Sequence, residues 1–159
     1  MHHQTASISS GIDDNSFRRT AMNDSVPYVT VKTAWEWLSA NPNAVLIDVR
    51  CEPEWRYAGV PVLDSLRKRP LLLSWLLRPY ANPNPDFRGQ LIMSVLSSRQ
   101  TLLFLSRTGR RSAAAVRHVL PDFPNSYSIR GGFEGPRDDS GHRGRLDGWK
   151  AAGLPWRQD

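Results

Sequence analysis

An apolar run that passes directly into a short basic loop constrains the fold more than any other stretch of this sequence. Residues 101–105 read Thr-Leu-Leu-Phe-Leu, the near-continuous apolar pattern of a strand buried on both faces. Ser112 is a favourable helix N-cap, and the three alanines after it favour a helix, which Pro121 would stop after Leu120. Residues 106–111 are therefore predicted to form the loop between a buried strand and a helix.

This predicted loop has the features of an anion-binding site. The first backbone N–H groups of a helix have no intrahelical partner, and that end of the helix carries partial positive charge. Gly109 allows a tight turn and a close approach to a ligand, and Arg107, Arg110 and Arg111 add full charges. We expect a cradle for an anion or a negatively charged nucleophile, with Ser106 at its mouth.

Other short apolar runs alternate with helical patterns along the chain. The expected strands are residues 28–29, 44–48, 70–75 and 126–129. The expected helices are residues 31–40, 52–57, 85–95 (capped by Asn84) and 146–152. The expected turns and loops are residues 78–84, 131–135 and 138–145. This alternation predicts an α/β domain with a central, mostly parallel sheet flanked by helices.

Parallel strands end on the same edge of a sheet, and ligands bind there. The residues that follow the predicted strands are Asp48 to Cys51, the Ser106 loop and Arg130. We expect them to lie near one another. Asp48 ends a buried strand, where a carboxylate needs a partner, and Arg50 or loop N–H groups are the candidates.

The length and hydropathy of the chain bound its organisation. A chain of 159 residues favours one domain. Residues 1–25 are polar and without apolar periodicity, which predicts a disordered extension before a domain over residues 26–159. No apolar run reaches the roughly 18 residues of a membrane span, and no signal-peptide core is present. We expect a cytoplasmic protein without membrane contact.

The basic residues are mostly arginines. The net charge is +6, and only Lys32, Lys68 and Lys150 of the 21 basic residues are lysines. This bias suits oxyanion binding, because guanidinium makes forked hydrogen bonds, although base composition and solubility explain it equally well. The arginines are scattered among acidic residues and form no basic stripe, so we expect no nucleic-acid partner.

Cysteine and histidine give no metal or cofactor prediction. Cys51 is the single cysteine, which excludes an intrachain disulfide and a cysteine-rich zinc site. His118 and His142 have no partners at metal-ligand spacing. Cys51 itself is interpreted as a small, partly buried side chain, since the sequence indicates no helix N-terminus or cation cluster to ionise it.

Four motifs, in order, resemble those of the rhodanese family. The sequence Leu-Ile-Asp-Val-Arg at 46–50, followed by Glu54 and Trp55, is similar to its second-strand motif. Residues 105–112 are similar to its active-site loop, Cys-Arg-x-Gly-x-Arg-Ser, and residues 131–133 and 148–156 to its C-terminal signatures. The likeness spans residues 29–158 and is closest to small single-domain bacterial thiosulfate sulfurtransferases. It implies a rhodanese-like three-layer domain.

The resemblance also implies a chemistry. The family moves a sulfane sulfur from a donor such as thiosulfate to a loop cysteine, and the persulfide passes it to a thiophile. The expected partners are therefore thiosulfate, or a protein persulfide or thiol acceptor, with no cofactor. The altered segment Ala58-Gly-Val-Pro-Val62, without the usual histidine, resembles a variant of some bacterial subfamilies.

The family's cysteine position is occupied by Ser106. A hydroxyl cannot form a persulfide, and no histidine in the loop offers a base to activate it. Three explanations stay open: a naturally degenerate rhodanese, a serine introduced in place of cysteine, or a different nucleophile. We predict a sulfurtransferase domain that is inactive with Ser106; the alternative is a non-catalytic module that binds an anion or a partner. A phosphatase is disfavoured, because the loop is too short to enclose phosphate.

The resemblance assigns roles to single residues. Ser106 stands at the catalytic position, and Arg111 is expected to support the loop or clamp the anion. Asp48 and Arg50 are expected to be architectural. The loop residues expected to contact an anion are Arg107, Thr108, Gly109, Arg110 and Ser112.

Overall fold

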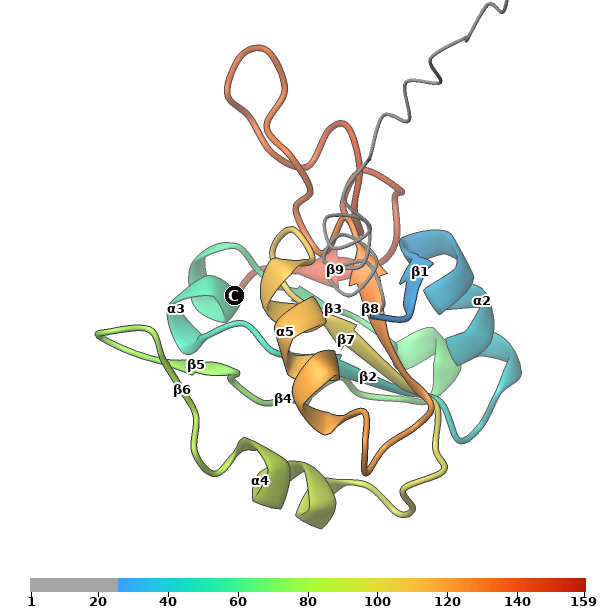
Figure 1. The fold of residues 1–159 in the computed structure, drawn as a ribbon. Helices are drawn as coiled ribbons and strands as arrows, with labels where there is room; N and C mark the ends of the chain where they lie inside the picture. The colour runs from blue at the N-terminus through green and yellow to red at the C-terminus, as the bar shows by residue number, and fades with distance from the viewer. Residues whose placement is uncertain (1–25) are drawn as a thin grey trace, which may run out of the picture.

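The computed structural model describes residues 26–159, and the extension predicted over residues 1–25 lies outside them. A five-stranded parallel sheet forms the centre of the molecule, in the order β1-β8-β7-β2-β4 (Figure 1). Its strands are β1 (Tyr28–Thr30), β2 (Val45–Asp48), β4 (Leu71–Leu72), β7 (Leu102–Leu105) and β8 (Ser126–Arg130). The predicted α/β class with a parallel sheet is confirmed.

Helices cover both faces of this sheet and complete three layers (Figure 1). One layer contains α4 (Phe87–Ser94) and α5 (Arg110–Val119), whose buried side chains share a core with Leu102 and Phe104. The other contains α2 (Val31–Ala40) and the 3₁₀ turn η1 (Asp64–Leu66), which pack with Leu103 and Leu105. Alternate β7 residues thus enter opposite cores, as the pleat requires, and all four are fully buried.

Three shorter elements lie at the edges of these layers. The helix α3 (Glu52–Tyr57) follows β2. The antiparallel pair β3 (Val60–Pro61) and β9 (Trp156–Arg157) joins the end of the chain to the segment after α3. A second pair, β5 (Leu76–Leu77) and β6 (Asn82–Pro83), makes a projecting hairpin. Within residues 26–159, no helix is both long and apolar enough to cross a bilayer.

The predicted N-cap of the loop helix, Ser112, is wrong by three residues. The helix α5 begins at Arg110, and its N-cap is Gly109 with a φ of 103°, a left-handed conformation that favours glycine. Ser112 is therefore in the first turn. The serine that accepts from N–H groups at this helix end is Ser106. It lies six residues before Ser112, too far from the alanines to be predicted as a cap.

Three other boundaries also differ from the prediction. The helix expected from Pro85 begins at Phe87, because Asn84 Oδ1 accepts from the Asp86 N–H in a turn. The predicted loop over residues 78–84 includes β6. The helix expected over residues 146–152 is a series of turns, since Gly148 has a φ of 98° where its backbone lies against Gly132.

Candidate anion-binding loop

The loop between β7 and α5 folds around the side chain of Ser106. Its Oγ accepts from the backbone N–H of Gly109 at 3.1 Å and of Ser112 at 3.2 Å, and its hydroxyl donates to Ser112 Oγ at 3.0 Å. Ser106 is fully buried. It therefore lies at the base of the loop, not at its mouth as predicted, and stabilises the first turn of α5.

Four other backbone N–H groups of the loop remain available. Among residues 26–159, none of the N–H groups of Arg107, Thr108, Arg110 and Arg111 donates to a protein acceptor. They surround the N-terminus of a ten-residue helix, where unpaired N–H groups and the helix dipole favour negative charge. This end of α5 has the donors of an anion cradle.

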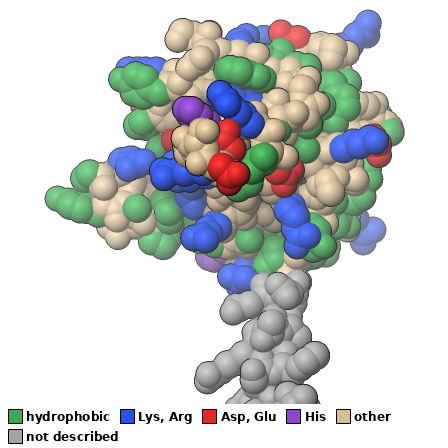
Figure 2. Space-filling view, turned by 90° about the horizontal axis from the view of Figure 1, so that it is seen from above, with side chains coloured by type: hydrophobic (Ala, Val, Ile, Leu, Met, Phe, Trp, Pro, Cys, Tyr) green, Lys and Arg blue, Asp and Glu red, His purple; other side chains and the backbone are tan. Residues whose placement is uncertain are grey.

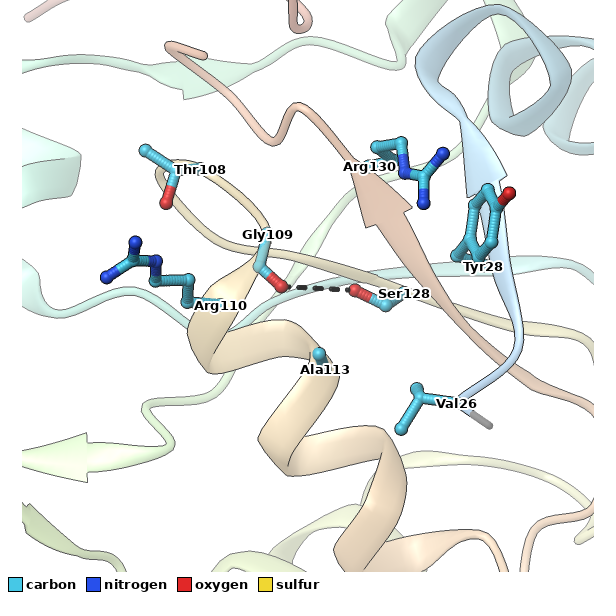
Figure 3. A pocket seen from close by; sticks show the side chains of 8 residues that line it. All are labelled: Val26, Tyr28, Thr108, Gly109, Arg110, Ala113, Ser128 and Arg130. Carbon is cyan, nitrogen blue, oxygen red and sulfur yellow. Dashed lines mark hydrogen bonds between the residues drawn. The ribbon is translucent and has the colours of Figure 1, made fainter. Parts of the chain in front are cut away.

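A chain of hydroxyl groups fixes the loop against β8. Ser112 Oγ donates to the Gly109 carbonyl at 3.1 Å and lies 2.8 Å from Ser128 Oγ. Figure 3 shows the contact between Gly109 and Ser128, with Thr108 at the tip of the loop. Because Ser106, Ser112 and Ser128 are all buried, this network holds the turn in one conformation.

The segment after β8 clamps the loop from the other side. The Phe133 N–H donates to the Ser106 carbonyl at 2.8 Å, and the Glu134 N–H to the Arg107 carbonyl at 3.0 Å. Gly132, with a φ of 65°, lies directly against these two carbonyl groups, so a side chain there would collide with backbone. The glycine motif at residues 131–133 therefore has a defined structural purpose.

Arg111 is held by a carboxylate that the sequence analysis did not assign to the site. Its Nη1 and Nη2 contact Glu54 Oε1 and Oε2 at 2.5 and 2.7 Å. Burial alone raises the pKa of Glu54, but hydrogen bonds from Arg111 and Cys51 lower it to about 2. The bond to Glu54 also raises the pKa of Arg111. This pairing commits Arg111 to anchoring α5 to α3; the signal for it was the spacing of Glu54 after the β2 motif.

Asp48 and Arg50 form a fully buried ion pair below the loop. Arg50 Nε and Nη2 contact the carboxylate at 2.9 and 2.6 Å, and Nη2 also donates to the Gly59 carbonyl at 2.8 Å. The guanidinium lies 4.1 Å from the centre of the Phe133 ring. The expected partner of Asp48 is therefore Arg50, and the pair connects β2 to the segment that clamps the loop.

Cys51 has surroundings that the sequence analysis did not foresee. Its side chain is buried as expected, but it is the N-cap residue of α3, and Arg78 Nε lies 3.4 Å from its Sγ. This thiol contact raises the pKa of Arg78. A cleft of about 280 Å³ lies here, lined by Cys51, Glu54, Leu76, Arg78, Ala81, Arg107 and Arg111. The expectation that Cys51 has no helix N-terminus or cation cluster beside it is wrong.

The predicted site residues lie together at one edge of the sheet. Arg107 and Arg110 are exposed there, and Arg130 extends over the ring of Tyr28, 3.7 Å from its centre (Figure 3). The face seen in Figure 2 carries many Lys and Arg side chains and fewer acidic ones. Among the described residues, no group of three or more His, Cys, Asp or Glu side chains could hold a metal ion.

Comparisons with known proteins agree on the fold. No model of a known protein family matches the chain. The RP600 homolog of Rickettsia rickettsii is 35% identical over 136 residues, which cover 84% of this chain and 98% of that protein. The crystal structure of Rv0390 from M. tuberculosis is 41% identical, covers 84% of this chain and 98% of that one, and has a TM-score of 0.76.

Two more distant relatives have descriptive names. A chloroplastic rhodanese-like domain-containing protein 4 of Arabidopsis thaliana is 26% identical over 129 residues, which cover 80% of this chain and 25% of that longer protein. The polysulfide-sulfur transferase homodimer of Wolinella succinogenes is 23% identical, covers 92% of this chain and 90% of that one, and has a TM-score of 0.60. The latter likeness is one of fold.

Proposed function

Because this chain belongs to the rhodanese-like domain family, we propose that residues 106–112 are the anion-binding loop of a sulfurtransferase-type domain. We propose further that Ser106 lets the loop bind a sulfur-containing anion such as thiosulfate but prevents it from carrying persulfide sulfur. The observation that carries this proposal is the set of four unpaired N–H groups around the first turn of α5. Such groups stabilise thiosulfate or a persulfide through hydrogen bonds to negative charge.

The chemistry of the loop depends on the atom at position 106. With a cysteine there, a thiolate attacks the outer sulfur of thiosulfate, the S–S bond breaks and sulfite leaves. A thiol or cyanide then takes the outer sulfur of the persulfide, and the thiolate is restored. The cradle suits this role, since helix N-terminal N–H groups and nearby arginines lower a thiol pKa.

A serine in the same cradle lacks a route to this reaction. The Ser106 hydroxyl donates to Ser112 Oγ, and Ser112 donates to the Gly109 carbonyl, so the chain of hydroxyl groups ends on an acceptor that cannot take a proton near neutral pH. No histidine or carboxylate within residues 26–159 hydrogen-bonds to Ser106. Nucleophilic serines need such a base. The alternative of a binding module without turnover fits these contacts.

The test is thiosulfate:cyanide sulfurtransferase activity of the chain beside Ser106→Cys. We expect thiocyanate and sulfite only from Ser106→Cys, and mass spectrometry of that variant after thiosulfate should show the added mass of one sulfur atom. The double variant Ser106→Cys/Cys51→Ala should keep this sulfur, which assigns it to position 106. Turnover by the serine form at a comparable rate would overturn the proposal.

Thiosulfate binding shows whether the anion-binding loop is intact in the absence of turnover. Calorimetric titration with thiosulfate should show binding to the unaltered chain. After treatment with thiosulfate, mass spectra of the unaltered chain should show no added sulfur atom, either at Ser106 or at Cys51. If Ser106→Cys is folded and also inactive, the loop has only a binding role, and the sulfurtransferase part of the proposal is wrong.

A further inference from the structure

A second basic hollow lies beside the loop and shares Arg107, Thr108 and Arg110 with it. Its volume is about 610 Å³, within the range of pockets that take small molecules. Its lining residues are Arg107, Thr108, Arg110, Arg130, Gly131, Pro136, Arg137, Arg143 and Asp147. We call it the arginine-lined hollow. Five arginine residues from three segments of the chain line it.

No carboxylate of residues 26–159 pairs with these five arginines. Among the described residues, none of the five forms an ion pair, whereas Arg50, Arg88 and Arg111 do. Arg143 donates to the Gly135 carbonyl at 2.8 Å, which positions it without cancelling its charge. The pKa of Arg143 is lowered, first by its burial and then by the charges of Arg107 and Arg137. Repulsion of this kind is relieved when an anion binds.

We propose that the arginine-lined hollow binds an extended polyanion of the phosphate class, such as a chain of two or three phosphate groups. Guanidinium forks bind phosphate oxygens in pairs. A single small anion cannot contact five guanidinium groups spread over a hollow of about 610 Å³, whereas linked phosphates present several charged oxygens along their length. The hollow adjoins the N–H groups around α5, because Arg107, Thr108 and Arg110 line it. Arg130, Arg137 and Arg143 lie outside the loop, and Arg107 also lines the cleft at Cys51.

The lining favours a small polyanion over the acidic segment of a partner protein. Protein interfaces combine arginine with aromatic anchors such as Trp and Tyr, and no aromatic side chain lines the hollow. Asp147 is its one acidic residue, and its carboxylate accepts from the Gly148 N–H at 2.7 Å. Apart from Asp147, every charged side chain that lines the hollow is an arginine.

Calorimetric titration of the full chain with tripolyphosphate, with orthophosphate as the comparison, tests this site. We expect tripolyphosphate to bind at least about tenfold more tightly, the equivalent of one additional charge-assisted contact. The affinity should fall steeply with added salt. Equal affinity for the two probes would overturn the proposal.

Charge reversal locates the binding. Arg137→Glu should weaken tripolyphosphate binding by about tenfold or more. Arg99→Glu is the matched control, because it makes the same charge change at an exposed position before β7, at the opposite end of the strand; it should change the affinity less than about threefold. If Arg99→Glu weakens binding as much as Arg137→Glu, the effect is one of net charge and the site is not in the hollow.

A hexaglutamate peptide separates phosphate chemistry from acidic protein segments. Binding of this peptide as tightly as tripolyphosphate, with the same loss in Arg137→Glu, would replace the phosphate-class ligand by an acidic partner. Arg137 lies outside the loop, so the effect of Arg137→Glu on tripolyphosphate binding and the sulfur-transfer activity of Ser106→Cys can fail independently.

Discussion

Arg111 and Glu54 are joined by two parallel hydrogen bonds, Nη1 to Oε1 and Nη2 to Oε2, across 57 positions of the chain. The forked geometry is the strongest that an arginine and a carboxylate can adopt. It links the first turn of α5 to α3 and so connects the anion-binding loop to the opposite wall of the cleft that contains Cys51. The stability of the loop is therefore sensitive to this pair.

Glu54→Gln should destabilise the fold and change its response to acid. The pKa of Glu54 is about 2 in the fold and 4.5 ordinarily. A lowered folded-state pKa stabilises above the ordinary value, and this stability is lost as pH falls from about 4.5 to about 2. After allowance for solvent screening, we expect a loss of about 1–2 kcal/mol at pH 7 in urea unfolding. The difference between the two proteins should shrink at pH 2–3, the acidic end of this window.

Glu52→Gln is the matched control. Glu52 pairs with Arg56, but the two side chains are 72% and 65% exposed. Surface pairs of this kind contribute less than about 1 kcal/mol. If both substitutions lower the free energy of unfolding equally, the contact between Glu54 and Arg111 stabilises the fold no more than a surface ion pair.

Asp48→Asn should be among the most damaging polar substitutions. The Asp48 and Arg50 side chains are fully buried, and removing one charge leaves the other unpaired in the core. We expect the free energy of unfolding to fall by about 3–5 kcal/mol, measured by chemical denaturation. Asp122→Asn, which breaks a half-exposed pair with Arg88, should cost less than about 1 kcal/mol; similar costs would contradict the assigned burial.

Gly132→Ala tests the clamp behind the loop. The added Cβ would collide with the Ser106 and Arg107 carbonyl groups at a φ of 65°, so we expect a loss of more than about 2 kcal/mol in thermal unfolding. Gly153→Ala places the same group at a φ of 70° in open space and should cost only about 1 kcal/mol of backbone strain. If the two variants unfold at the same temperature, the contact of Gly132 with the Ser106 and Arg107 carbonyl groups does not exclude a side chain.

Ser106→Ala removes the acceptor for two N–H groups in a buried site. We expect a loss of about 1–3 kcal/mol and faster hydrogen exchange at the Gly109 and Ser112 amides. The exposed hydroxyl of Ser94, which donates within its own helix, provides the comparison: Ser94→Ala should leave stability within about 0.5 kcal/mol. Unchanged exchange in Ser106→Ala would mean that the side chain does not hold the loop.

The elements of the fold were predictable because each has a local pattern. The apolar run of β7 and the amphipathic α2 are confirmed with boundaries within one residue. The helix expected over residues 146–152 failed because tertiary contacts decide that segment: Trp149 is fully buried and its indole N–H donates to the Pro155 carbonyl. Periodicity cannot distinguish such packing from helical amphipathicity.

The site was predictable where it is a continuous motif or where it follows directly from the end of a strand, as for Asp48, Arg50 and Arg130. The loop from Ser106 to Ser112 is a single motif, and its position after β7 follows from the buried strand. The fold brings residues from distant segments of the chain next to the loop. These residues are Glu54, Arg78 and Arg143. The motif after β2 includes Glu54 but does not indicate Arg111 as its partner, and nothing near Arg78 or Arg143 in sequence indicates theirs. These contacts therefore required the three-dimensional structure.

The capping of α5 by residue 106 has a consequence for how such a domain can change. The two N–H groups that donate to Ser106 Oγ need an acceptor. A cysteine sulfur at the same place would also accept from them, although more weakly. We therefore expect the loop to keep nearly the same conformation with a serine oxygen or a cysteine sulfur at position 106. Ser106→Cys should thus change the chemistry of the loop while the surrounding hydrogen bonds and the fold persist.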